Sequence, residues 1–147
     1  MKTNFKKAKT EKEIQAIVDY NIDAFSDSPD FKWTFEEVKK EVSEGWELFS
    51  LMESTEVLAA VFYKIEKESL LTKNTAIKVT HQGSGYSHII KEFFEKVARD
   101  HKLKKIFHYC RIDNFRMYSL NESHQYKKTD KKIGEDGLVV EWVKSLK

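Results

Sequence analysis

Apolar side chains recur at helical spacing in two long segments of this chain. The first segment follows Thr10 and Glu13, which form a capping-box pair, and its apolar positions are Ile14, Ile17, Val18, Ile22 and Phe25. The second segment begins near residue 87, and its apolar positions are Ile89, Ile90, Phe93, Phe94, Val97 and Ala98. Spacings of three and four residues place such side chains on one face of an amphipathic helix. Helices are therefore predicted after Thr10 and over roughly residues 87–101. Two shorter helices are predicted from Thr34, which forms a second capping box with Glu37, to about Val42, and over residues 114–122.

Short β-prone runs separate these helices and cover residues 4–8, 46–52, 57–65, 69–79, 105–110, 126–132 and 138–144. The run 105–110 is apolar on both faces, which is typical of a central strand. Residues 75–79, the loop and helix after them, and 105–110 form a crossover unit, and such a unit makes two strands parallel. The hairpins on either side make the remaining pairs antiparallel. We therefore predict one α/β domain over residues 1–147, with a mixed sheet of about six or seven strands and helices on both faces.

Composition agrees with a folded domain that has a charged surface, because 40% of the 147 residues are hydrophobic, 34% are charged and the net charge is only +2. No apolar run approaches the roughly 20 residues of a membrane span, and the first residues lack the apolar core of a secretory signal. The single cysteine, Cys110, excludes an intramolecular disulfide. We therefore expect a cytoplasmic protein with no membrane or nucleic-acid partner. RNA binding along the lysines of residues 127–132 is a weaker alternative, and it predicts a steep dependence of affinity on salt.

The most informative segment is THQGSGYS, residues 80–87, which joins a predicted strand to a predicted helix. Glycine allows positive φ and close approach of a ligand, so Gly83 and Gly85 can aim several backbone N–H groups at one anion. The first-turn N–H groups of a helix have no partner inside the helix, and the helix dipole adds partial positive charge there. The segment therefore predicts a phosphate or pyrophosphate site, with an ordinary turn as the alternative.

The element order and two motifs resemble the GCN5-related N-acetyltransferase (GNAT) superfamily. The first motif is Gln82-x-x-Gly85-x-Ser87 at the junction of strand and helix, with serine where the family has glycine or alanine. The second is the segment Asn114-Phe115-Arg116-Met117 followed by Leu120-Asn121-Glu122, which is similar to the branch with an Asn-x-x-Met-x-x-x-Asn signature.

The resemblance implies acetyl-coenzyme A as the cofactor. Its pyrophosphate would rest on the loop, at Gln82 and the backbone N–H groups of Gly83, Ser84, Gly85, Tyr86 and Ser87. Its pantetheine arm would pair with the preceding strand near Ile77 and Val79, like an added β-strand. Asn114 would lie near the arm or the sulfur, although it also suits a helix N-cap. Met117 belongs to the same motif, and as an apolar helical residue it equally suits the core.

Two positions depart from the family pattern. Asn121 stands where many relatives have a tyrosine that protonates the departing thiolate, which leaves the general acid unidentified. Tyr118 lies one turn earlier on the same helix face and is a weak substitute. Gln125 stands where the family prefers glycine, and a left-handed conformation would cost a non-glycine residue about 1 kcal/mol or more. We therefore expect an altered turn at Gln125.

The chemistry of acetyl transfer requires a neutral amine, hydrogen bonds to the thioester oxygen and close alignment of the reacting atoms. Glu53 and Glu66, near strand ends, are candidate bases, and solvated charges are the alternative. Cys110 could accept an acyl group if its pKa were lowered, but a small buried hydrophobe is the favoured interpretation. His108 shares a strand face with Cys110, and two ligands do not make a zinc site.

The sequence therefore predicts an acetyl-coenzyme A-dependent N-acetyltransferase that transfers an acetyl group directly to a primary amine. The alternative is an acyl-coenzyme A sensor or interaction module with little or no turnover. The acceptor, a small molecule or a peptide, and a homodimeric state stay open.

Overall fold

The computed structural model describes residues 3–19, 34–74, 85–112, 115–133 and 137–146. The strands in this part of the chain are β1 (Thr3–Lys7), β2 (Glu47–Glu53), β3 (Glu56–Glu66), β4 (Ser69–Asn74), β5 (Lys105–Arg111), β6 (Lys127–Ile133) and β7 (Val139–Ser145). The helices are α1 (Glu11–Asp19), α2 (Phe35–Ser43), α3 (Tyr86–Asp100) and α4 (Phe115–Ser123). Each helix and each strand begins and ends within two residues of its predicted bounds, wherever those bounds lie in the described residues.

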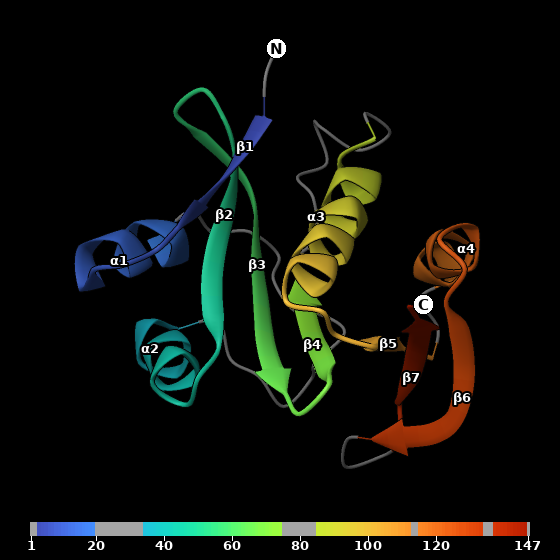
Figure 1. The fold of residues 1–147 in the computed structure, drawn as a ribbon. Helices are drawn as coiled ribbons and strands as arrows, with labels where there is room; N and C mark the ends of the chain where they lie inside the picture. The colour runs from blue at the N-terminus through green and yellow to red at the C-terminus, as the bar shows by residue number, and fades with distance from the viewer. Residues whose placement is uncertain (1–2, 20–33, 75–84, 113–114, 134–136, 147) are drawn as a thin grey trace.

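All seven described strands form one mixed sheet in the order β1-β2-β3-β4-β5-β7-β6 (Figure 1). The pair β4–β5 is parallel, and every other neighbouring pair is antiparallel. The helix α3 connects the two parallel strands, which confirms the predicted crossover unit. Residues 75–79, predicted as the end of the strand before the loop, lie outside the described residues.

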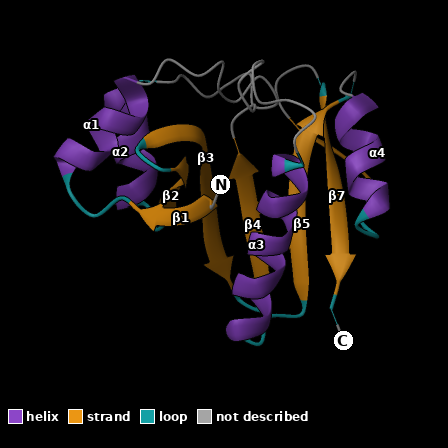
Figure 2. Ribbon diagram, turned by 90° about the horizontal axis from the view of Figure 1, so that it is seen from above, coloured by secondary structure: helices purple, strands orange, loops and turns teal. Residues whose placement is uncertain are grey.

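Helices cover both faces of the sheet, as predicted (Figure 2). Leu48 of β2 packs in one core cluster with Ile17 of α1 and Val38 of α2. The next residue along β2, Phe49, packs against the other cluster, and its ring lies 5.2 Å from that of Phe93 on α3. Successive side chains of a strand point to opposite faces, so α1 and α2 cover one face and α3 the other. Trp142 of β7 lies on the α3 face, where its ring meets Tyr118 of α4, so α4 covers the same face as α3.

The turn after α4 corrects one expectation. Gln125 itself takes the left-handed conformation, with φ of 69°, so the prediction of an altered turn is wrong. The N–H of Tyr126 donates to the carbonyl of Asn121 at 2.9 Å, and the N–H of Gln125 donates to that of Glu122 at 3.0 Å. These two bonds form a Schellman motif. They offset the conformational cost together with the burial of Tyr126, which is only 3% exposed.

Candidate functional site

The two parallel strands separate in the middle of the sheet. Their pairing runs from Ser69 and Lys105 to Thr72 and His108. Beyond His108, β5 continues to Arg111, and β7 is its only partner among the described strands. Ligands of α/β proteins bind beyond the carboxyl ends of parallel strands, where neighbouring strands diverge. The end of the β4–β5 pairing is therefore the place at which an extended ligand could add its own hydrogen bonds.

The helix α3 begins beside this point with an unusual N-terminus. Its N-cap is Gly85, which has φ of 83° and supplies no side-chain cap. The other two capped helix starts differ, because Thr10 and Thr34 accept N–H bonds of their own helices at 3.2 Å. A Cβ built on Gly85 would meet nothing within 4 Å. The first turn of α3 therefore has no side-chain cap and has room beside Gly85, and the positive end of the helix dipole there suits an anion.

The predicted cofactor residues divide between the part of the chain that the structure describes and the rest. Ile77, Val79, Gln82, Gly83, Ser84 and Asn114 lie outside the described residues. Of the predicted loop, the structure places Gly85, Tyr86 and Ser87 at the start of α3. Their contact with a cofactor stays a prediction, as does the proposed branch signature that includes Asn114.

Two predicted residues meet at the start of α3. The hydroxyl of Tyr86 donates a short hydrogen bond to Glu53 at the end of β2. This bond, and then burial and the charge of Glu53, raise the pKa of Tyr86. Glu53, a candidate base from sequence, therefore lies beside the N-terminus of α3, whereas Glu66 is exposed at the far end of β3.

Of the α4 residues that were predicted to belong to the site, Asn121 is buried and Met117 and Tyr118 are half-buried. Asn121 is 0% exposed, and neither polar atom of its side chain has a hydrogen-bond partner within the described structure. The ring of Tyr118 meets that of Trp142 edge-on at 5.1 Å. Met117 packs against the core cluster, as its apolar character suggested. An unpartnered buried amide is costly, so Asn121 is the residue here that most needs an explanation.

A layer of buried polar groups lies between α3 and β5. Lys91 is 1% exposed, and its Nζ lies 4.4 Å from the centre of the Tyr126 ring. Burial, and then the charge of Lys91, hold the pKa of His108 well below its ordinary value. His108 is therefore neutral at physiological pH. The sequence analysis missed Lys91, although its spacing of three from Phe94 and seven from Ala98 places it on the buried face of α3.

Cys110 is fully buried, as the interpretation as a small hydrophobe requires. No group of three or more metal-ligating side chains occurs among the residues that the structure describes. In the same part of the chain, no helix combines the length and the apolar character of a membrane-spanning segment.

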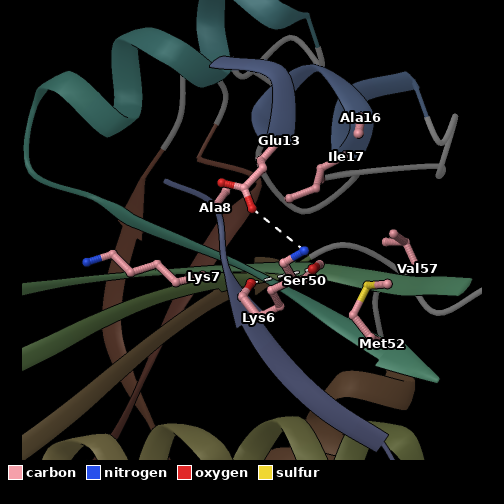
Figure 3. Close-up of a pocket in the computed structure, with 9 residues that line it drawn as sticks. All are labelled: Lys6, Lys7, Ala8, Glu13, Ala16, Ile17, Ser50, Met52 and Val57. Atoms are coloured by element: carbon pink, nitrogen blue, oxygen red, sulfur yellow. Dashed lines mark hydrogen bonds and ion pairs between the residues drawn. The ribbon is translucent and has the colours of Figure 1, made fainter. Parts of the chain in front are cut away.

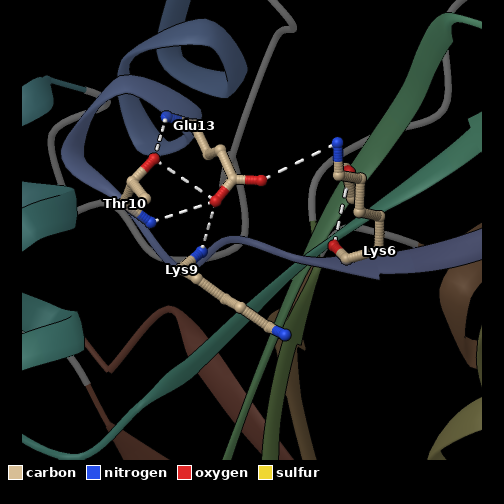
Figure 4. Close-up of polar contacts among 5 residues, drawn as sticks. Lys6, Lys9, Thr10 and Glu13 are labelled. Carbon is tan, nitrogen blue, oxygen red and sulfur yellow. Dashed lines mark hydrogen bonds and ion pairs between the residues drawn. The ribbon is translucent and has the colours of Figure 1, made fainter.

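A separate cavity of about 110 Å³ lies between α1 and the strands β1, β2 and β3 (Figure 3). Its wall is mostly apolar, with Ile17, Met52 and Val57 among the lining residues. Lys6 and Glu13 form an ion pair at 3.7 Å beside it. Glu13 is also engaged with backbone N–H groups of Lys9 and Thr10 (Figure 4). None of the predicted site residues that the structure describes lines this cavity. Its charged residues already have partners, because Lys6 and Glu13 pair with each other and Lys7 pairs with Glu47.

Comparison with known proteins identifies the fold. No family model and no curated protein matches this chain. Solved structures do match over nearly its whole length. The ribosomal-protein-S18-alanine N-acetyltransferase from Escherichia coli has a TM-score of 0.77 at 14% identity, over 98% of this chain and 94% of that chain. The PaiA N-acetyltransferase from Thermoplasma acidophilum, in complex with coenzyme A, has a TM-score of 0.77 at 11% identity, over 99% and 100% of the two chains. A GNAT family acetyltransferase from Elizabethkingia anophelis, with acetyl-CoA bound, has a TM-score of 0.72 at 15% identity, over 98% of each chain.

These likenesses define the class of fold. The chain has the GNAT fold, a mixed seven-stranded sheet with helices on both faces and one parallel pair at its centre. The fold predicted from the sequence motifs is therefore confirmed.

Proposed function

We propose that this protein is an acetyl-coenzyme A-dependent N-acetyltransferase that transfers the acetyl group directly to a primary amine. The GNAT fold supports this function, and two of the matching structures contain acetyl-CoA or coenzyme A. The motifs at residues 82–87 and 114–122 support it independently, because they come from the sequence and not from the fold comparison.

One observation carries the proposal. Within the described residues, the β4–β5 pairing ends at Thr72 and His108, and α3 starts at Gly85 without a side-chain cap. A nucleotide-linked diphosphate suits the N–H groups of Gly85, Tyr86 and Ser87, together with those predicted for Gly83 and Ser84. An extended arm suits the separating strands, as an added β-strand. Coenzyme A has both parts, in that order.

Positioning supplies much of the rate in this scheme. In such a transfer the neutral amine nitrogen would attack the thioester carbon, the C–S bond would break, and the proton that the nitrogen loses would end on the departing sulfur. Asn121 can donate a hydrogen bond from its amide, but an amide is no acid at neutral pH. Asn121 would therefore orient the thioester or stabilise the thiolate, and Tyr118, one turn earlier on the same helix, would supply a hydroxyl. Holding thioester and amine in line is the largest contribution that this site can make.

A binding module without turnover is the second candidate function. The observation that favours it is Asn121, which occupies the position of the family's tyrosine and is fully buried. The two functions share the cofactor, and they differ only in whether the bound thioester is then cleaved by an amine.

Two measurements test the proposal in sequence. Calorimetric titration with acetyl-coenzyme A should show saturable binding to one site per chain, and absence of binding at high micromolar concentration would reject both candidates. Thiol release is then measured across small amines, peptides and aminoglycosides. Acceptor-dependent release supports the transferase, whereas binding without release from any acceptor favours the module.

A further inference from the structure

Glu141 of β7 is a buried carboxylate, and its residue is only 8% exposed. Among the charged side chains that the structure describes, only Lys91 is also buried. The neighbours of Glu141 along β7, Val140 and Trp142, belong to the core under α3. Because side chains alternate along a strand, Glu141 points to the opposite face of the sheet from Lys91. These two charges therefore do not neutralise each other by contact.

Two hydroxyl groups donate hydrogen bonds to Glu141. Tyr109 donates to its Oε2 at 3.0 Å, and Thr129 donates to its Oε1 at 3.1 Å. Hydroxyls satisfy the oxygens but bring no positive charge, and a buried charge is costly without a paired cation. The cation that the described structure places nearest is Lys131, whose Nζ lies 3.9 Å from Oε2 and whose side chain is 62% exposed. The two hydroxyls thus fix the position of the Glu141 carboxylate. The cation beside it, the ammonium group of Lys131, is at the end of a long and exposed side chain.

The carboxylate lies at the edge of the candidate site. Tyr109 follows His108, the last β5 residue that pairs with β4. Tyr109 also pairs in register with Glu141 across β5 and β7. His108 faces α3, so Tyr109 and Glu141 face the other side of the sheet. Under the proposed function, the thioester end of the cofactor lies where β4 and β5 separate, and an acceptor approaching from the face opposite α3 meets this pair.

We propose that Glu141, held by Tyr109 and Thr129, binds the ammonium group of the acceptor beside the thioester, and that the ammonium then gives one proton to this carboxylate so that the neutral nitrogen can attack. This inference rests on the proposed function and deepens it, because it selects acceptors that arrive as cations over neutral nucleophiles such as alcohols. Lys131 demonstrates the geometry, since its own ammonium group approaches the same oxygen from solvent. A substrate ammonium replaces Lys131, whose exposed side chain is able to move aside.

The inference can be tested without knowing the acceptor. S-(2-aminoethyl)-coenzyme A places an ammonium group just beyond the sulfur, and S-propyl-coenzyme A is its neutral counterpart of similar size. Calorimetry on the full chain should show that the aminoethyl compound binds at least about tenfold more tightly than the propyl compound, which is the effect of one buried charge pair. In Glu141→Gln the two compounds should bind equally, with the affinity for coenzyme A itself unchanged.

Two further variants serve as controls. Glu66→Gln removes an exposed carboxylate whose charge also raises the pKa of Tyr109, and this variant should keep the preference for ammonium. Lys131→Gln removes the competing cation from an exposed position and should increase the preference several-fold. It also keeps the inference testable if Glu141→Gln does not fold.

The outcomes separate the two proposals. Binding of coenzyme A without a preference for the aminoethyl compound, or a preference that persists in Glu141→Gln, would overturn the role of Glu141 and leave the proposed function intact. Failure of coenzyme A and both derivatives to bind would overturn the proposed function, and the inference with it.

Discussion

The hydroxyl of Tyr86, the first residue of α3, donates a hydrogen bond to Oε2 of Glu53 at the end of β2. This contact connects the start of the candidate anion site to β2, which lies two strands away from β4 in the sheet. It also places a carboxylate beside the helix end at which we expect a diphosphate. A negative charge near that end opposes anion binding, so Glu53 should affect the affinity for the cofactor.

We therefore expect Glu53→Gln to tighten coenzyme A binding by a few-fold, on the order of 1 kcal/mol for one screened charge. The gain should shrink at high salt. Calorimetry at low and high ionic strength measures both effects, with Tyr86→Phe as the control that keeps the charge but removes the hydrogen bond. A fall of about a hundredfold or more in thiol release, with unchanged coenzyme A affinity, would instead identify Glu53 as the base predicted from sequence.

Gly85→Ala should weaken coenzyme A binding by at least about tenfold, because a Cβ on the N-cap of α3 crowds the approach of a diphosphate. The protein should still fold, since that Cβ meets nothing within 4 Å. The matched control is Gly137→Ala, because Gly137 also has positive φ, at 65°, and lies outside the candidate site. Both variants should lose about 1–2 kcal/mol of unfolding free energy from backbone strain. Equal coenzyme A affinity in the two variants would remove Gly85 from the site.

Asn121→Leu should separate stability from function. The buried amide has no hydrogen-bond partner within the described structure, so an apolar side chain of similar size should raise the unfolding free energy by about 1 kcal/mol. Thiol release should fall sharply if the amide contacts the thioester or the thiolate. Urea unfolding and an acceptor assay on the same preparation measure the two effects. A loss of stability in this variant would show that Asn121 is a structural residue with partners in the folded protein.

His108 should make the protein less stable in mild acid. Burial and Lys91 hold its pKa well below the ordinary value, so the unfolded chain binds more protons as pH falls. The contribution of His108 is therefore fully present above the unfolded pKa of about 6.5 and is lost as pH falls toward the folded pKa, by up to about 1.4 kcal/mol per pH unit. Burial and the charges of His88 and Lys91 lower the pKa of His124 as well, which adds to the same trend.

Urea unfolding at about pH 7.5 and 5.5 measures this dependence. His108→Leu should flatten this dependence. An identical slope in His108→Leu would mean that the imidazole binds protons equally in the folded and unfolded states.

Local pattern accounts for most of the elements. The apolar spacing from Ile89 to Ala98 predicted α3, and the THQGSGYS segment predicted a turn into it that ends in the left-handed residue Gly85. The turn at Gln125 was predicted wrongly. Propensity alone disfavours a left-handed glutamine, but the Schellman bonds and the burial of Tyr126 outweigh that preference.

The two buried charged residues show what the sequence pattern does not predict. Lys91 lies in the apolar stripe of α3, and Glu141 stands alone among the apolar residues of β7. Both positions can be recognised in the sequence, because a single charged residue in an apolar run is expected to be buried and therefore to need a polar partner. The signal does not say which partner, because Tyr109 and Thr129 come from two different strands.

The amino-acid sequence by itself determined the elements, the parallel crossover and the glycine at the start of α3, because periodicity and turn chemistry act over a few neighbouring residues. The tertiary structure decided that β7 lies between β5 and β6, which brings Glu141 against Tyr109 across 32 residues of chain. It also decided that Lys91 lies over Tyr126 and near His108. Such contacts depend on strand order and register, and these are set by how the whole hydrophobic core packs rather than by any one segment.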